Sequence, residues 1–142
     1  MLTNFLTSDH RDCDALFAKA ENAASDGGFD AARAAYAEFE AAMARHLSIE
    51  ESVLFPEFEA RSGMVGGPTT VMRVEHEQMR AMMAQTRQAL ECGELDDFLG
   101  CSETLNILIQ QHNMKEEQML YPICDRALAD RAEALLERMQ AY

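Results

Sequence analysis

The sequence predicts an all-α protein, an antiparallel up-down-up-down bundle of four helices with a short C-terminal helix. Ala, Glu, Leu and Met are abundant, while there are three prolines and no tryptophan, a composition that favours helix. Apolar residues recur at helical spacing through four long segments, and the short connections between them leave few other arrangements. With 142 residues, of which 48% are hydrophobic, the chain suits one domain, residues 1–142, with a real core.

The first helix is expected from Leu2 to about Ser25, with Thr3 as its N-cap and the turn residues 26–28 as its end. The second is expected from about Asp30 to Ala60, and Pro56 should kink or break it because proline lacks the backbone N–H. The apolar residues of these two helices are Phe5, Leu6, Cys13, Leu16, Phe17 and Ala20, then Tyr36, Phe39, Met43, Leu47, Val53 and Leu54.

A loop over Arg61–Gly67 is expected to separate the first pair of helices from the second. Pro68 suits the first position of a third helix, because the N–H that proline lacks has no partner there. That helix should continue to about Glu91, and Cys92-Gly93 should end it. Its apolar residues are Val71, Val74, Met79, Met82 and Met83.

The fourth helix is expected from about Leu95 to Tyr121, where Pro122 should interrupt it. Its apolar residues include Phe98, Leu105, Leu108 and Ile109. Residues Asp125–Gln140 have the pattern of a shorter amphipathic helix. This segment is the predicted C-terminal addition to the bundle.

The chain also repeats itself. Residues 46–56 read HLSIEESVLFP and residues 112–122 read HNMKEEQMLYP, so both fit H-x-x-x-E-E-x-x-L-[FY]-P at an offset of 66 residues. DHRDCDALFA, from Asp9, and EHEQMRAMMA, from Glu75, match at the same offset, which pairs His10 with His76. The two matches include every histidine of the protein. We therefore expect two copies of one helical hairpin, about residues 1–61 and 67–127, packed with pseudo-twofold symmetry.

The repeated residues are suited to bind metal ions. Positions i and i+4 lie on one helix face, so each histidine of the two motifs projects with a glutamate. An antiparallel bundle would then bring together one histidine from each helix and two carboxylates. The candidate ligands are His10, His46, Glu50, His76, His112 and Glu116. This set is too large for one tetrahedral zinc with an open position, and it suits two ions of iron, manganese or zinc if both glutamates bridge.

Simpler interpretations exist for each element alone. A single histidine in a helix is usually a surface or hydrogen-bonded residue, and an HxxxE pair is usually a local helix-surface contact. Four histidines, one on each helix, together with two duplicated HxxxE pairs, favour a metal site over a plain helical bundle. Open coordination positions at such a site would be where O2, peroxide or NO binds.

These residues resemble the signature of the hemerythrin-like family, called the HHE cation-binding domain in its bacterial form. The resemblance covers about residues 5–125, and the LFP and LYP endings of the two motifs are typical of the family. It implies a four-helix bundle with a non-haem di-iron centre, bridged by two carboxylates and an oxo or hydroxo group. It also implies that His10 and His46 serve one iron, and His76 and His112 the other.

The sequence departs from the oxygen-carrying members of that family. Those proteins have a fifth histidine in an HxxxH on the third helix, whereas Met72 and Arg80 stand four residues from His76 here. The carboxylate of the fourth helix, Glu116, is four residues from its histidine, where the carriers use an aspartate at the fifth position. Both differences put reversible O2 carriage in doubt, and a site with more open positions favours redox turnover or another ligand.

Several residues near the motifs have two interpretations. Glu51 and Glu117 lie about 140° around the helix from their histidines, which favours a surface or interhelical position. The alternative is that each accepts a hydrogen bond from a histidine N–H or replaces a ligand. Tyr36 and Tyr121 are expected to be packing residues, and Cys13, one turn after His10, is expected in the core.

The leading hypothesis is a small di-iron protein that binds or senses O2, NO or a reactive oxygen species. One alternative is a di-iron oxidoreductase that handles peroxide or NO, although no motif for an electron donor is evident. Another is an iron store, iron donor or structural metal module, with zinc or manganese in place of iron. The sequence does not decide whether the protein is an enzyme.

Charge and cysteine usage limit the remaining partners. The net charge of −13 argues against nucleic acid or an anionic membrane as a partner. The four cysteines form no CxxC pair, and the sequence contains neither a signal peptide nor an apolar run that could span a bilayer. A cytoplasmic protein with free thiols is therefore expected, with a homodimer as one option for its assembly.

Overall fold

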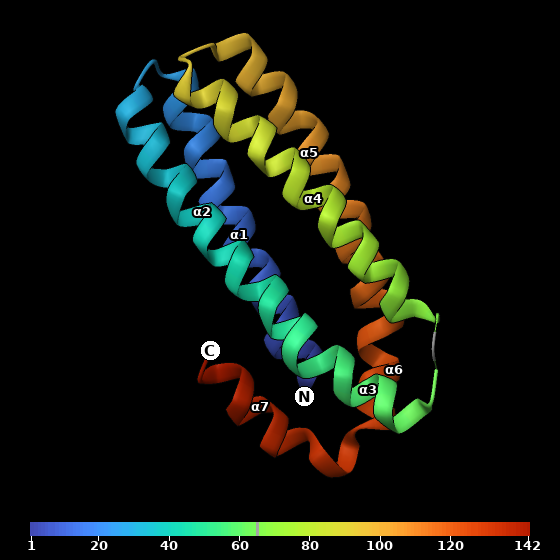
Figure 1. The fold of residues 1–142 in the computed structure, drawn as a ribbon. Coiled ribbons are helices and arrows are strands. Elements are labelled where there is room, and N and C mark those ends of the chain that lie inside the picture. Colours follow the sequence, from blue (N-terminus) through green and yellow to red (C-terminus); the bar gives the residue numbers. More distant parts are fainter. Residues whose placement is uncertain (65) are drawn as a thin grey trace.

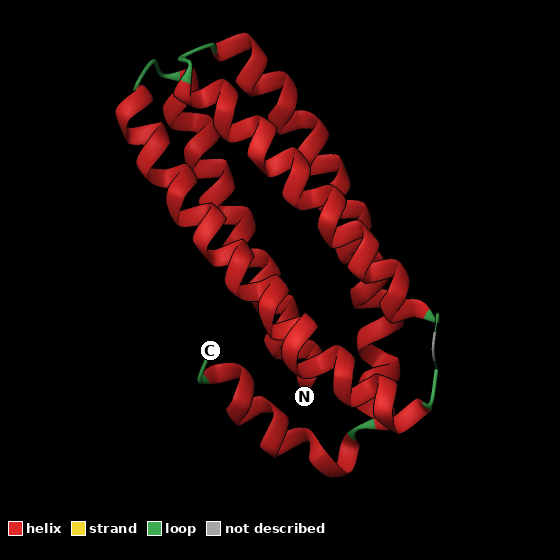
Figure 2. Ribbon diagram, in the orientation of Figure 1, coloured by secondary structure: helices red, strands yellow, loops and turns green. Residues whose placement is uncertain are grey.

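The computed structural model describes residues 1–64 and 66–142, and over these residues it contains helices and loops but no strand (Figure 2). The four long helices are α1 (Leu2–Ser25), α2 (Phe29–Ile49), α4 (Pro68–Glu91) and α5 (Leu95–Lys115). In Figure 1, α1 lies beside α2 and α4 beside α5, with the two short connections of these pairs at the same end of the molecule. The predicted all-α bundle is confirmed.

Both long segments that carry an HxxxE motif contain a wider helical turn that begins at the glutamate of the motif. α2 passes through the π-helical turn η1 (Glu50–Leu54) into α3 (Phe55–Ser62), and α5 passes through η2 (Glu116–Leu120) into α6 (Tyr121–Ala127). Each π turn ends with an N–H that bonds to the carbonyl five residues earlier, from Phe55 to Glu50 and from Tyr121 to Glu116.

The two prolines explain where these π turns lie. Pro56 and Pro122 are the second residues of α3 and α6. A proline there has no N–H to donate and its ring would clash with the carbonyl four residues earlier, so the backbone widens just before it. The chain stays helical through both prolines, so Pro56 does not break its helix and Pro122 does not interrupt the other one, and in each case the irregularity precedes the proline.

The first turns of α1 and α4 begin in different ways. Thr3 is not the N-cap of α1, because the helix starts at Leu2. Asp125 of α6 caps α1 instead, accepting hydrogen bonds from the N–H groups of Leu2 at 2.9 Å and Thr3 at 3.2 Å. Pro68 is the first residue of α4, as predicted. The predicted loop over 61–67 includes residue 65, which lies outside the described residues, and α3 continues to Ser62.

The C-terminal segment starts later than expected. α6 ends at Ala127, a 3₁₀ turn η3 (Ala129–Arg131) follows, and α7 (Ala132–Gln140) is the tail helix. Leu135 and Met139 of α7 are fully buried. Figure 1 shows α7 crossing the end of the bundle where both termini lie. The short C-terminal helix is thus confirmed, with Ala132 rather than Asp125 as its first residue.

The core consists of two apolar clusters with a polar layer between them. One cluster, near the short connections, includes Phe17, Tyr36 and Phe39, and the other, near the termini, includes Leu6 and Leu54. Along each long segment the histidine falls between residues of the two clusters. The apolar pattern thus places the four histidines at one level of the bundle.

The buried side of α4 differs from the sequence expectation. Val71 and Val74 are 50% and 54% exposed, and Met72 joins Met79 and Met83 as a buried residue instead. The three positions follow the 3- and 4-residue spacing of one helix face, together with His76.

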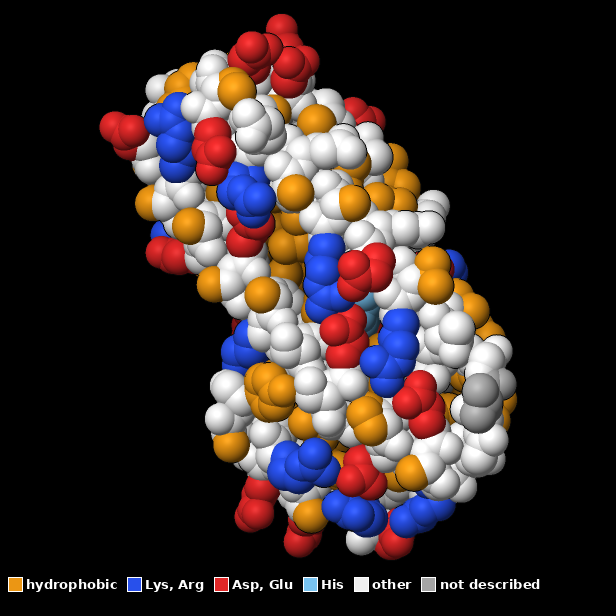
Figure 3. All heavy atoms as spheres, viewed as in Figure 1, with side chains coloured by type: hydrophobic (Ala, Val, Ile, Leu, Met, Phe, Trp, Pro, Cys, Tyr) orange, Lys and Arg blue, Asp and Glu red, His pale blue; other side chains and the backbone are white. Residues whose placement is uncertain are grey.

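The surface between α2 and α4 is charged. Arg73, Arg80 and Arg87 of α4 pair with glutamates of the neighbouring segments at 3.1, 2.9 and 2.6 Å. Figure 3 shows basic and acidic side chains interleaved along this face. Exposed ion pairs of this kind each stabilise a protein little, so we expect them to contribute little to the stability of the α2–α4 contact. In the described part of the chain, no helix is both long and apolar enough to cross a membrane.

Candidate metal centre

The structure brings all six predicted ligands together in the polar layer. His10 lies on α1, His46 on α2, His76 on α4 and His112 on α5. Glu50 and Glu116 are the first residues of the two π turns. The six residues are at most 3% exposed; they are His10, His46, Glu50, His76, His112 and Glu116.

Donor atoms of these residues form two overlapping groups. Ligand atoms of Glu50, His76, His112 and Glu116 lie within 4.8 Å of one another, and so do those of His10, His46 and Glu116. Glu116 belongs to both groups because its Oε1 lies 3.1 Å from His10 Nε2 and its Oε2 lies 3.1 Å from His112 Nε2. We call the two groups the His10–His46 half and the His76–His112 half.

Glu50 also connects the two halves. Its Oε1 lies 3.4 Å from His46 Nε2 and 3.2 Å from His76 Nε2. Each of the two glutamates therefore faces one histidine of either half. A carboxylate in this position can bridge two ions.

The other ring nitrogen of every histidine is held by a carboxylate from a neighbouring segment. The Nδ1–oxygen pairs are His10–Glu117 (2.7 Å), His46–Asp9 (2.8 Å), His76–Glu51 (2.7 Å) and His112–Glu75 (2.8 Å). We call these four acids the outer carboxylates. An ionised carboxylate only accepts, so each Nδ1 carries the proton and each Nε2 is directed at the centre.

The four outer bonds form a closed ring around the bundle. His46 joins α2 to α1, and His112 joins α5 to α4. His76 joins α4 to η1, and His10 joins α1 to η2. Carboxylates behind metal-binding histidines commonly fix the ring orientation and raise the basicity of the ligating nitrogen.

The interior of the layer fits a cation. His76 Nε2 and His112 Nε2 face each other at 3.2 Å, a separation at which two N–H donors would repel. The buried atoms Glu50 Oε1 and Glu116 Oε2 have no well-directed hydrogen bond. Buried lone pairs and charges without partners are costly, and a metal ion would satisfy imidazole and carboxylate together.

The pKa values also indicate that the two buried glutamates favour positive charge in this layer. Burial lowers the pKa of His46, but Glu50 and Asp9 more than offset it and raise the pKa to about 10. Burial also lowers the pKa of His76, but Glu116 and Glu50 outweigh it and raise the pKa to about 9. Burial favours a neutral Glu116, yet Glu50 and the surrounding imidazoles hold its pKa well below the usual range.

Tyr121 was expected to be a packing residue, and the structure corrects this. Its ring is buried, but its hydroxyl lies among the donor atoms of the His10–His46 half. The hydroxyl donates to Glu50 Oε2 at 2.6 Å and lies 3.0 Å from Glu116 Oε1. It also lies 3.1 Å from His10 Nε2 and 3.5 Å from His46 Nε2. Burial and the two glutamates raise the pKa of Tyr121 well above 10.

The roles of the second glutamates also become clear. Glu51 and Glu117 accept hydrogen bonds from histidines, which was the alternative to the surface or interhelical interpretation. Sequence reasoning missed Asp9 and Glu75 in the same role. Both stand inside the matched stretches, one residue before a histidine, and their shared acidic character at the 66-residue offset was the available signal.

The remaining candidates lie away from the centre. Tyr36 donates to the Met83 carbonyl at 2.7 Å in the core, as a packing residue would. Cys13 is buried in the core, as expected, and burial raises the pKa of its thiol to about 12. Cys124 is buried too, and all four cysteines are free.

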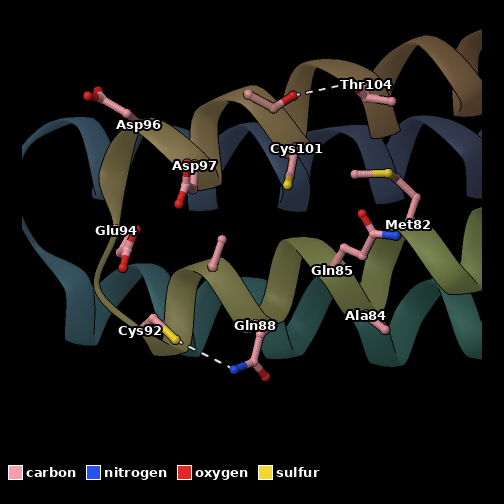
Figure 4. Close-up of a pocket in the computed structure, with 12 residues that line it drawn as sticks. Met82, Ala84, Gln85, Gln88, Cys92, Glu94, Asp96, Asp97, Cys101 and Thr104 are labelled. Carbon is pink, nitrogen blue, oxygen red and sulfur yellow. Dashed lines mark hydrogen bonds between the residues drawn. The ribbon is translucent and has the colours of Figure 1, made fainter.

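One large surface hollow lies away from the histidines. It has a volume of about 760 Å³ and lies between α4 and α5 near their connection, where Figure 4 shows Gln85, Gln88 and Cys101 beside it. None of the six predicted ligands lines it. The chemistry of the donor atoms, and not the size of a hollow, therefore identifies the candidate site.

Comparison with known families agrees with this geometry. Residues 1–124 match the family model described as the Hemerythrin HHE cation binding domain. The chain belongs to this hemerythrin family. The match covers all six predicted ligands and both π turns, and the buried His/Glu cluster fits the cation binding for which the family is described. Comparison with curated proteins and with solved structures gave no match.

Proposed function

We propose that this hemerythrin-family protein is a non-haem di-iron protein that binds or senses O2, NO or a reactive oxygen species. The observation that carries the proposal is the convergence of four imidazole Nε2 atoms on two buried carboxylates that each face both halves. The proposed ligands are His10, His46, Glu50, His76, His112 and Glu116. An oxo or hydroxo group is the proposed third bridge.

The charge and number of the donors support two ions over one. Glu116 offers a different oxygen to each half at 3.1 Å, so a single ion would leave one pair of imidazoles without a partner. Mixed nitrogen and oxygen ligands suit iron, and zinc or manganese would fit the same atoms. Two ions in a two-metal site are expected about 3.5–4 Å apart.

The space beside His112 suits a small ligand. A surface hollow of about 90 Å³ lies between α4 and α5 and is lined by His112, Glu75 and Lys115 among others. A water needs roughly 10–15 Å³ of such space, so this hollow suits a molecule of a few atoms. It is too small for a drug-sized or cofactor-sized substrate, which needs on the order of 300 Å³ or more.

The chain itself supplies orientation and exclusion of water. The outer carboxylates hold each imidazole with Nε2 inward, and the two apolar clusters keep bulk water from the layer. Iron would add open coordination positions and a change of oxidation state. With four histidines and no fifth, the site differs from that expected of a reversible O2 carrier.

The decisive experiment is metal analysis of the purified protein combined with optical spectra before and after anaerobic reduction. We expect two irons per chain and a visible spectrum that changes when O2 or NO is added to the reduced protein. His46→Gln and His112→Gln should lower the iron content, while Glu57→Gln, a change outside the polar layer, should leave it unaltered.

Other results would favour the alternatives. Steady-state consumption of peroxide or NO with an electron donor would indicate an oxidoreductase. Readily exchanging iron, or zinc, with no response to either gas would indicate a storage, donor or structural module. Unchanged metal content in both histidine variants would overturn the proposed site.

A further inference from the structure

The two halves of the candidate centre are related by the 66-residue offset but differ at one aromatic ring. Tyr121 stacks on His10 with ring centroids 5.6 Å apart and planes at 27°. Its counterpart, Phe55, stacks on His76 with the same separation and angle. The backbone and ring positions thus repeat, and the hydroxyl of Tyr121 is the added group.

The π turn accounts for the place of this hydroxyl. In an α-helix, residues five apart are separated by about 140° around the axis, so Tyr121 would not share a face with Glu116. In η2 the Tyr121 N–H bonds to the Glu116 carbonyl, which aligns the two residues, and the hydroxyl reaches Glu116 Oε1 at 3.0 Å. The same turn at η1 aligns Phe55 with Glu50.

The hydroxyl oxygen lies where an ion of the His10–His46 half would find its ligands. Four donor atoms surround it at 2.6 to 3.5 Å: Glu50 Oε2, Glu116 Oε1, His10 Nε2 and His46 Nε2. A hydroxyl has one proton and can donate one hydrogen bond, so the Tyr121 hydroxyl cannot satisfy all four of these atoms. A cation could bind several of them together with the phenolic oxygen. The Phe55 side chain can supply no such atom to the other half.

We propose that Tyr121 is a seventh ligand, binding through its phenolic oxygen the iron of the His10–His46 half alone. The proposal rests on the di-iron function proposed above. On binding, the oxygen–hydrogen bond breaks, an oxygen–iron bond forms, and the proton is released to solvent. The two ions are then chemically unlike, one with a phenolate and one with an open position beside Phe55.

The test is resonance Raman spectroscopy of the protein loaded with ferric iron, prepared with ordinary and with ring-deuterated tyrosine. A tyrosine bound to ferric iron gives a visible charge-transfer band, and excitation in that band enhances its ring vibrations. We expect these vibrations in the wild type, shifted by deuteration, and lost in Tyr121→Phe. Tyr36→Phe, which removes a buried hydroxyl from the core, should keep them.

The outcomes separate the two proposals. A wild-type protein that takes up iron without phenolate vibrations overturns the Tyr121 ligand and leaves the di-iron function standing, whatever the variants do. Vibrations that persist in Tyr121→Phe also overturn it. A wild-type protein that takes up no iron overturns both proposals. Two irons per chain in Tyr121→Phe, with the vibrations lost, would assign the phenolate as an addition to the six other ligands.

Discussion

Each half of the candidate centre contains two histidines, and the halves differ in the residues around these histidines. Where the His10–His46 half has Tyr121 and Asp14, the His76–His112 half has Phe55 and Arg80 at the corresponding positions. Arg80 binds Glu51 through two contacts of 2.9 and 3.0 Å. The two halves thus hold histidine pairs of similar geometry, with ring centroids 4.6 and 4.8 Å apart, in different electrostatic surroundings.

The outer carboxylates reflect this difference. Burial raises the pKa of Glu51, but Arg80 and His76 outweigh it and lower the pKa. Near Glu117 stands Asp14 instead of an arginine, and the pKa of Asp14 is raised by burial and, in part, by the charge of Glu117. Glu51 therefore has a basic partner, Arg80, where Glu117 has an acidic neighbour, Asp14.

The largest expected effect tests whether the halves can be separated at all. Glu116→Gln removes the charge that both halves share, so we expect the protein to fall from two bound ions to none. His10→Ala should leave one ion in the other half. Metal content after dialysis measures both, with circular dichroism as the check on folding. Loss of both ions in His10→Ala would show that the halves act as one unit.

A smaller effect is expected from the outer carboxylates. Glu51→Gln and Glu117→Gln should each weaken metal binding by about 10- to 100-fold, the usual effect of losing an acceptor behind a ligating histidine. Competition with a chelator measures the affinity. Glu51→Gln should also lower the melting temperature more than Glu117→Gln, because Arg80 loses the charge of one of its two partners, Glu51, and keeps Glu77. Equal melting temperatures would contradict the contrast between the halves.

The smallest effect concerns the helix starts of the two halves. Asp125 accepts two N–H groups of α1, so Asp125→Ala should cost about 1 kcal/mol, or roughly 3 °C in melting temperature. Its counterpart, Glu59, bonds the hydroxyl of Thr69 and the side chain of Arg73 but no backbone N–H of the residues that the structure describes. Glu59→Ala should therefore cost less, and an equal or larger loss would contradict the capping role of Asp125.

The same carboxylate predicts a pH effect of known sign. Burial raises the pKa of Asp125, but the Thr3 hydroxyl and the two N–H groups lower it below 3.8, its unfolded value. Its contribution to the free energy of unfolding is thus present above pH 3.8 and is lost as the pH falls through the folded pKa. The difference in free energy of unfolding between the wild type and Asp125→Ala should therefore become smaller in acid. Denaturant unfolding at several pH values measures it.

The sequence was sufficient for the bundle and for the identity of the six buried residues. Helical periodicity located the four segments, and the HxxxE spacing put His46 with Glu50 and His112 with Glu116 on shared faces. The match at 66 residues added His10 and His76. These features depend on the chain's own helical geometry, which local sequence determines. The two-hairpin division, the cytoplasmic location and a homodimer stay predictions.

The missed features depend on contacts between segments. Pro56 and Pro122 predicted an irregular helix, but the sequence did not show that the backbone would widen in the turns that begin at Glu50 and Glu116. Without η2, Tyr121 projects elsewhere, so its hydroxyl could not be assigned to the centre. The partners of Asp9 and Glu75 lie on other helices, and the rotation of one helix against another is set by the packed core.

The closed ring of outer hydrogen bonds has a consequence for cooperativity. Each bond ties two different segments, and the four bonds return to the helix where they start. Turning one imidazole therefore pulls on a carboxylate whose own helix carries, or adjoins, the next imidazole. Ions that enter one after the other would meet rings already restrained by the earlier arrival, so the entropy lost in ordering the second site is smaller than that lost in ordering the first.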